Sequence, residues 1–219
     1  NVWKVSLRDM PFVLSKNLPG ATTVASTMRI ASMAGIKIFA TGGIGGVHRG
    51  AENSMDISAD LTEMAQTNVA VVSAGVKSIL DIALTLEYME TKGIPVITFG
   101  QDEFPSFYSR KSGLHSPLRL DTAKEIADLL KVKWLAGLNG SVLIANPIPA
   151  SDEVHASVIE VHIREALAAA EQQNISRKEV TPFLLKYISD HAQGESLEAN
   201  IALVINNAKL AAQIAVAMK

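Results

Sequence analysis

Residues 38–81 read IFATGGIGGVHRGAENSMDISADLTEMAQTNVAVVSAGVKSILD, and this stretch decides the fold. Apolar runs at 36–41 and 69–73 bracket a polar segment that is rich in glycine and acidic residues. The second run, VAVVS, is continuously apolar and β-branched, which is typical of a strand buried on both faces of a parallel sheet. A helical pattern at 78–91 and an apolar run at 94–99 follow, so the chain contains a strand–helix–strand unit. The stretch predicts an α/β fold.

The rest of the chain extends this pattern in both directions. Residues 1–20 form a mixed segment interrupted by prolines, and 100–120 read as a long irregular loop that contains aromatic residues. The periodicity predicts one further strand at 141–146 and helices at 21–35, 61–66, 122–138, 152–173, 180–192 and 196–218. We expect Ser78 and Asp121 to cap the helices that follow them. The prediction is one α/β domain over 1–219, with a mixed, mainly parallel sheet flanked by helices and a helical C-terminal layer.

The composition excludes several classes of protein. The 20 basic and 22 acidic residues nearly cancel, so there is no global field to attract a nucleic acid polymer or an anionic membrane. No run of about 18 apolar residues predicts a membrane span, and no secretory signal is evident. The absence of cysteine excludes disulfides and thiol chemistry, and it favours a cytoplasmic location. The chain begins at Asn1 without a methionine, so we expect an upstream portion to be missing.

The glycine-rich loop at 42–46 follows the first predicted strand. It lacks the spacing of a dinucleotide-binding fingerprint and the Gly-Lys-Ser/Thr of a Walker loop. Its glycines permit positive φ angles and a close approach of the backbone, so a phosphate or sugar could lie against its amides. A tight turn without a ligand is the alternative interpretation. His48 and Arg49 follow the loop and suit either a contact with a polar ligand or a structural pair.

Asp56, Ser58 and Asp60 alternate in the acidic segment. In an extended chain, side chains two residues apart project from the same face, so their oxygens would converge. Oxygen ligands of this kind suit Mg²⁺ or Mn²⁺, which keeps several waters when only one or two carboxylates bind it. A solvated acidic loop or a helix cap is the alternative.

Lys77 lies after the buried strand at 69–73, where we expect a helix to begin. The positive end of that helix and partial burial would both lower the pKa of the lysine. A neutral amine is what a Schiff-base nucleophile requires. A surface lysine at a helix start is the alternative.

Along nearly the whole chain, short runs of sequence match those of one known protein family, in the same order as in that family. They are GATTVAST (20–27), TGGIGGVHRGAE (41–52), DISADLTEMA (56–65), AGVKSILD (74–81), TLEYMETKGIPVI (85–97), DEFPSFYSRKSG (102–113), ANPIP (145–149), KEVTPFLL (178–185) and SLEANIALVINNAKLAA (196–212). Together they resemble the pseudouridine-5'-phosphate glycosidases, also called the indigoidine synthase A family. The resemblance implies a metal-dependent lyase or glycosidase that reversibly converts pseudouridine 5'-phosphate and water to uracil and ribose 5-phosphate.

The resemblance also implies a role for individual residues. Lys77 becomes the nucleophile that bonds ribose C1′, and Asp56 becomes the ligand of Mn²⁺ or another divalent cation such as Mg²⁺. The positions that match substrate contacts are Lys4, Val24, Ser58, Ala59 and Asp60, and those that match polar pocket positions are Thr41, His48 and Asn200. Lys4 suits the phosphate by its charge.

One part of the family pattern has no counterpart here. The general acid of the family is a glutamate near the N-terminus, and its position would lie before Asn1. An N-terminal fragment of the same protein is therefore an expected partner, and the family further implies a homotrimer. Two other interpretations stay open at this point. One is a non-catalytic sugar-phosphate-binding remnant, and the other is an unrelated aldolase-like enzyme that shares only the Schiff-base lysine.

Overall fold

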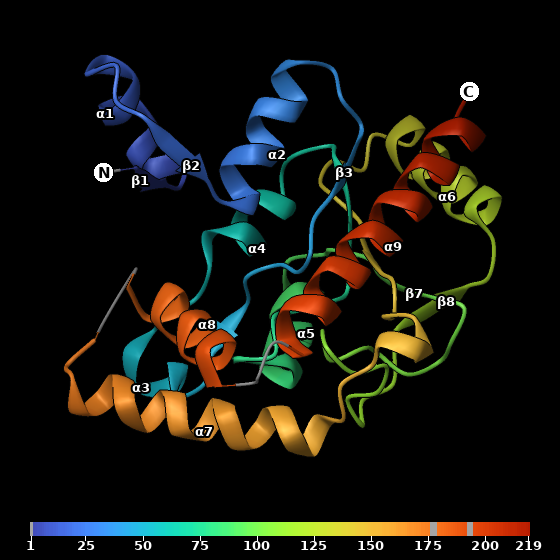
Figure 1. Ribbon diagram of the computed structural model, residues 1–219. Coiled ribbons are helices and arrows are strands. Elements are labelled where there is room, and N and C mark those ends of the chain that lie inside the picture. Colours follow the sequence, from blue (N-terminus) through green and yellow to red (C-terminus); the bar gives the residue numbers. More distant parts are fainter. Residues whose placement is uncertain (1, 176–178, 192–194) are drawn as a thin grey trace.

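The computed structural model describes residues 2–175, 179–191 and 195–219. At its centre lies a five-stranded sheet with the order β3-β5-β9-β7-β8, in which every neighbouring pair is parallel (Figure 1). The strands are β3 (Ile38–Ala40), β5 (Ala70–Ser73), β7 (Val96–Phe99), β8 (Leu118–Leu120) and β9 (Leu143–Ala145). The predicted α/β class and mainly parallel sheet are therefore confirmed.

Helices cover both faces of this sheet. In β5, Val71 packs into a core with side chains of α2 (Val24–Met33), α4 (Ala59–Met64) and α5 (Ile82–Thr91). The next residue, Val72, packs into a second core with side chains of α6 (Ala123–Leu135) and α9 (Glu195–Ala217). Successive side chains of a strand point to opposite faces, so one continuously apolar strand serves both cores.

Smaller elements flank the three layers. β1 (Trp3–Val5) and β2 (Gly20–Thr22) form a parallel pair with the 3₁₀ turn η1 (Leu7–Asp9) and α1 (Met10–Ser15) between them, at the upper left of Figure 1. β4 (Val47–His48) and β6 (Leu80–Asp81) form an antiparallel pair, and α3 (Ala51–Ser54) follows β4. η2 (Ala150–Asp152) leads to α7 (Ala156–Gln172), which contacts α8 (Val180–His191).

The C-terminal helices divide between two places. α9 crosses the sheet beside α6, with Leu203, Leu210 and Ile214 buried, whereas α7 and α8 contact each other (Figure 1). Residues Ser196–Ala217 of α9 are long and apolar enough to cross a membrane by length and composition, which the sequence reading did not anticipate. That indication is weak, because the core helix of a water-soluble protein meets the same test.

Two predicted helix caps are wrong. α5 begins at Ile82, and the Asp81 side chain accepts the Leu84 amide at 2.9 Å, so Asp81 is the cap in place of Ser78. The reason is that Leu80 and Asp81 pair with β4 and keep the chain extended. Likewise α6 is capped by Thr122 in a capping box with Glu125, one residue after the predicted Asp121. The predicted loop at 100–120 also contains β8 at its end.

Candidate functional site

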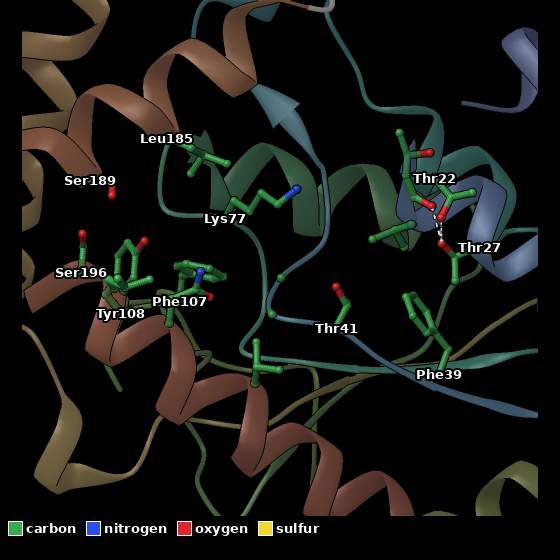
Figure 2. Close-up of a pocket in the computed structure, with 17 residues that line it drawn as sticks. Thr22, Thr27, Phe39, Thr41, Lys77, Phe107, Tyr108, Leu185, Ser189 and Ser196 are labelled. Atoms are coloured by element: carbon green, nitrogen blue, oxygen red, sulfur yellow. Dashed lines mark hydrogen bonds between the residues drawn. The ribbon is translucent and has the colours of Figure 1, made fainter. Parts of the chain in front are cut away.

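A pocket of about 420 Å³ opens where β3 ends. In parallel α/β sheets, ligands bind outside the carboxyl ends of the strands. Figure 2 shows the Lys77 side chain extending into this pocket, with Thr22 on the side toward which its nitrogen points and Tyr108 on the other side. The lining residues are Thr22, Thr23, Val24, Thr27, Phe39, Thr41, Gly42, Gly43, Lys77, Phe107, Tyr108, Leu185, Ser189, Ser196, Leu197, Asn200 and Val204.

Backbone hydrogen bonds fix the position of Lys77. Its amide donates to the Ile44 carbonyl at 3.2 Å and its carbonyl accepts the Leu80 amide at 3.0 Å, so the segment lies against the glycine loop. The side chain is half-buried, and this burial lowers the pKa of Lys77, while the charge of Asp60 partly opposes the shift. The lowered pKa agrees with the sequence prediction. The predicted contribution of a helix dipole is wrong, because α5 begins only at Ile82.

The glycine loop is packed from behind by side chains. A Cβ on Gly43 would lie 2.6 Å from the Phe107 ring, and one on Gly45 would lie 2.2 Å from the Ser58 hydroxyl. Neither glycine has a positive φ angle. The Gly45 amide already donates to Asp60 at 2.8 Å. Close packing therefore accounts for these glycines, and the structure favours a tight turn over a phosphate cradle, although Gly42 and Gly43 line the pocket.

The three acidic-segment oxygens do not share one extended face. The chain turns into α4 at Ser58, whose side chain accepts the Asp60 amide at 3.2 Å and caps that helix. Asp60 is 5% exposed, and its two carboxylate oxygens accept the amides of Ala25 and Gly45, each at 2.8 Å. The predicted extended face is wrong, because the helix start turns Asp60 toward α2 and the glycine loop. The oxygens of Ser58 and Asp60 nevertheless lie close together, 2.2 and 2.7 Å from the position of a Cβ on Gly45.

Of the two predicted carboxylates, Asp56 is the one that suits a hydrated divalent cation. No group of three or more His, Cys, Asp or Glu side chains that could hold a metal occurs within residues 2–175, 179–191 and 195–219. Asp60 is occupied by backbone amides, whereas the side chain of Asp56 is 38% exposed. A hard cation bound through one carboxylate retains waters as its remaining ligands, so Asp56 suits that mode.

His48 lies beside Asp56. Its Nε2 is 3.9 Å from Oδ2 of Asp56 and 3.5 Å from the hydroxyl of Thr181 on α8. Burial lowers the pKa of His48 and outweighs the opposing effect of Asp56. The imidazole is therefore neutral at pH 7, and the contact is polar without being an ion pair.

The N-terminus of α2 forms another wall of the pocket. Thr23 caps this helix by accepting the Ser26 amide, and the Thr27 hydroxyl donates to that of Thr22 at 2.9 Å. The first amides of a helix carry the positive end of its dipole, and in α2 the amide of Ala25 donates to Asp60 and that of Ser26 donates to Thr23. The Val24 amide is therefore the first-turn amide that this wall offers to a ligand. Val24 is the first helical residue and lines the pocket, as the sequence predicted for a contact position.

Lys4 adds positive charge near this wall. It lies on β1 with an exposed side chain, and its pKa is lowered by desolvation first and then by the charge of Lys77. Asp60, Glu179 and Asp56 raise it in part. Lys4 is thus near enough to Lys77 and to these three carboxylates for their charges to act on it.

The structure gathers some of the predicted residues and separates others. Val24, Thr41, Lys77 and Asn200 line the one pocket. Lys4, His48, Asp56 and Asp60 are electrostatically coupled within the same region. Ser58 and the exposed Ala59 lie at the start of α4 and are absent from the pocket lining.

The sequence indicates a functional or packing loop with aromatic residues at 100–120, but it assigns none of them to the site. Phe107 and Tyr108 pack edge to face at 4.6 Å, and Phe107 has a φ of 58°, which is rare for a bulky residue. Burial raises the pKa of Tyr108 to about 12, so this residue is neutral. The one available signal was the aromatic content of the long loop at 100–120. The pocket residues Ser189 and Ser196 on α8 and α9 gave no signal.

A separate cavity of about 860 Å³ lies on the other side of the Lys77 segment. It is lined by Ser78, whose buried hydroxyl has no hydrogen-bond partner, and by Arg49 and Glu160, which form a salt bridge at 2.9 Å. Arg49 is thus a structural partner of α7.

Fold and site together define an α/β protein with a half-buried lysine that extends into a pocket walled by a helix N-terminus. A family model described as indigoidine synthase A like protein matches residues 1–217, and the chain belongs to this family. The match removes the interpretation as an unrelated aldolase-like enzyme.

Curated relatives and solved structures agree with this assignment. The chain is 60% identical to the pseudouridine-5'-phosphate glycosidase of Geobacillus kaustophilus and 58% identical to that of Clostridium botulinum, over 98% of its own length and 71% and 70% of theirs. It superposes on the prealnumycin C-glycosynthase AlnA in complex with ribulose 5-phosphate with a TM-score of 0.93, at 38% identity, over 100% of this chain and 72% of that one. It superposes on an indigoidine synthase A-like protein of Thermotoga maritima with a TM-score of 0.91, also at 38% identity, over 99% of this chain and 71% of that one.

Proposed function

We propose that the protein is a pseudouridine-5'-phosphate glycosidase that reversibly cleaves the C-glycosidic bond to give uracil and ribose 5-phosphate. The observation that carries the proposal is Lys77, a half-buried lysine of lowered pKa that extends into a pocket with a helix N-terminus in its wall. The names of the relatives, at 58% and 60% identity, and the sugar phosphate in the AlnA structure support it.

In this proposal the substrate lies across the pocket. The phosphate binds at the N-terminus of α2, where Val24 supplies a first-turn amide and Lys4 supplies charge. The ribose lies next to Lys77, with Thr41 and Asn200 as polar contacts. The base lies toward the aromatic wall, where Phe107 offers a face for stacking.

The lysine supplies the route for bond cleavage. The neutral Lys77 nitrogen bonds to C1′ as the ring oxygen O4′ leaves and takes up a proton. The nitrogen lone pair then forms a C=N bond as the bond from C1′ to C5 of uracil breaks, and C5 takes up a proton. Water hydrolyses the imine, which releases ribose 5-phosphate and restores the lysine. Burial of Lys77 favours this route because it raises the fraction of neutral amine.

A divalent cation, Mn²⁺ or Mg²⁺, is proposed at Asp56 with water as its remaining ligands. When bound, it would supply positive charge and ordered water near the substrate. His48 is neutral and adjacent to Asp56, so it can orient that carboxylate or a water without adding repulsion.

Other features of the proposal remain predictions. They are that residues 1–219 form a single α/β domain, that the protein is a homotrimer located in the cytoplasm, and that a fragment from outside these residues supplies the general acid.

The test is turnover in the synthetic direction. The protein is incubated with uracil, ribose 5-phosphate and Mn²⁺, and pseudouridine 5'-phosphate is measured by chromatography. The proposal predicts product that disappears with Lys77→Arg, which keeps the charge but holds no neutral amine. A protein that binds ribose 5-phosphate and forms no product would support the remnant interpretation, and one that does neither would overturn both.

A further inference from the structure

Asn207 is a fully buried amide on α9 that ties this helix to the end of β3. Its Nδ2 donates to the Thr41 carbonyl at 2.9 Å and approaches the Gly42 carbonyl at 3.4 Å. Its Oδ1 accepts Nδ2 of Asn146, which follows β9, at 3.1 Å. One side chain therefore joins α9 to the ends of two strands of the central sheet.

This network fixes the orientation of the amide. Because the carbonyls of Thr41 and Gly42 can only accept, the nitrogen of Asn207 faces them and its oxygen accepts from Asn146. The Gly42 carbonyl also accepts the amide of Ala74 at 2.9 Å. The hydrogen-bond network of Asn207 therefore extends to the segment that leads to Lys77. A buried amide whose hydrogen bonds are all made specifies one arrangement of its neighbours.

The same helix carries pocket residues. Asn200 lies about two turns before Asn207 and so lies on nearly the same face of α9. Asn200 and Val204 line the pocket, and the Oδ1 atom of Asn200 is 3.3 Å from the position of a Cβ on Gly42. Rotation or sliding of α9 would therefore move Asn200 relative to Thr41 and Gly42, and the hydrogen bonds of Asn207 oppose that motion.

We propose that Asn207 is a positioning residue that sets the pocket wall formed by Thr41, Gly42 and Asn200. The catalytic part of this inference rests on the proposed function, whereas the structural part does not. Asn207 touches no substrate in this account, because it lies behind the wall and outside the pocket lining.

The test compares Asn207→Asp with Asn206→Asp. The first change turns a donor into a carboxylate oxygen that faces two carbonyls. Asn206 is its neighbour on the same helix and donates to the Pro147 carbonyl at 3.0 Å, away from the glycine loop, so it controls for a lost hydrogen bond in α9. Asn207→Ser, which is smaller and neutral, provides a second variant if the aspartate variant does not fold.

The first measurement is hydrogen exchange of the folded protein at the amides of Ile44 and Ala74. The Ile44 amide donates to the Gly75 carbonyl and the Ala74 amide donates to the Gly42 carbonyl, so both hydrogen bonds involve the loop that Asn207 contacts. We expect exchange to accelerate by about tenfold or more in the Asn207 variants, as the loss of one such hydrogen bond implies, and to stay within about twofold of the parent in Asn206→Asp. Equal exchange in the two sets would overturn the proposal, whether or not the protein is active.

The second measurement is the kinetics with ribose 5-phosphate and uracil. Asn207→Asp should raise KM for ribose 5-phosphate about tenfold and change kcat less, whereas Asn206→Asp should leave both near the parent values. In an Asn200→Ala background, Asn207→Asp should raise KM by a smaller factor than in the parent, because one of the contacts that Asn207 positions is already gone. An additive effect would contradict positioning through Asn200. A parent protein without turnover would contradict the proposed function, and the exchange data would still decide the role of Asn207.

Discussion

The carboxylate of Asp60 accepts the amide of Gly45 at 2.8 Å, and its second oxygen accepts the amide of Ala25 at the same distance. The glycine loop and the first turn of α2 are thus held by one buried side chain. These are two walls of the pocket, so the spacing between the N-terminus of α2 and the Lys77 segment depends on Asp60.

Asp60→Asn should therefore destabilise the fold. An asparagine offers one oxygen in place of two, and its NH₂ group would face an amide donor, so we expect a loss of about 1–3 kcal/mol in the free energy of unfolding. Urea denaturation measures this free energy of unfolding. Asp56→Asn, at an exposed carboxylate, is the matched control and should stay within about 0.5 kcal/mol of the parent. Equal effects of the two changes would show that the amide contacts of Asp60 are not stabilising.

Gly43→Ala should perturb the pocket through Phe107. The added Cβ would lie 2.6 Å from the ring, so we expect a cost of about 1–3 kcal/mol from overpacking. Phe107→Leu in the same chain removes the ring that clashes and should recover part of that stability. Thermal unfolding of the two single variants and the double variant tests this coupling, and strictly additive losses would contradict it.

The sequence predicted the central layers well and the local starts of helices poorly. The runs of β5 and β7 were found because buried parallel strands are apolar throughout. Serine is a common cap residue, so local propensity predicts a cap at Ser78. The pairing of Leu80 and Asp81 with β4 is a contact between distant residues that local propensity does not encode. β8 was missed for a similar reason, since only its pairing with β7 makes it a strand.

In the site, too, features that depend on local sequence were predictable and features that depend on contacts between distant residues were not. Lys77 was found from its position after a strand, and its lowered pKa followed from burial. The role of Asp60 could not be read from the alternation of Asp56, Ser58 and Asp60, because α4 begins within that segment. Tyr108 and Ser196 come from segments that only the fold brings to Lys77, so no spacing in the sequence predicts them.

Lys77→Met should stabilise the protein most at neutral and acidic pH. The pKa of Lys77 is lowered in the folded state, so between that value and the unfolded value the unfolded chain binds more protons and stability rises with pH. Burial of the charged lysine is therefore costly below the folded pKa, and the cost vanishes above about 10.5. We expect a higher Tm for Lys77→Met at pH 7 and a difference that shrinks toward pH 10.5. A difference independent of pH would contradict the burial of the charge.

Asp56→Ala tests the proposed cation. The side chain is partly exposed, so the variant should keep its fold while Mn²⁺ affinity falls by about tenfold or more. Calorimetric titration with Mn²⁺ measures the affinity without reference to turnover, and chelation followed by re-addition of metal tests activity. Unchanged Mn²⁺ binding in the variant would exclude Asp56 as the ligand.

The most direct test of the central claim is reduction of the protein with borohydride in the presence of ribose 5-phosphate. An imine at Lys77 would be trapped as a secondary amine, so mass spectrometry of the digested protein should show the peptide that contains Lys77 heavier by ribose 5-phosphate less one oxygen atom. The modification should be absent without sugar phosphate and in Lys77→Arg. An unmodified Lys77 peptide from a preparation that forms pseudouridine 5'-phosphate would contradict the proposed lysine chemistry.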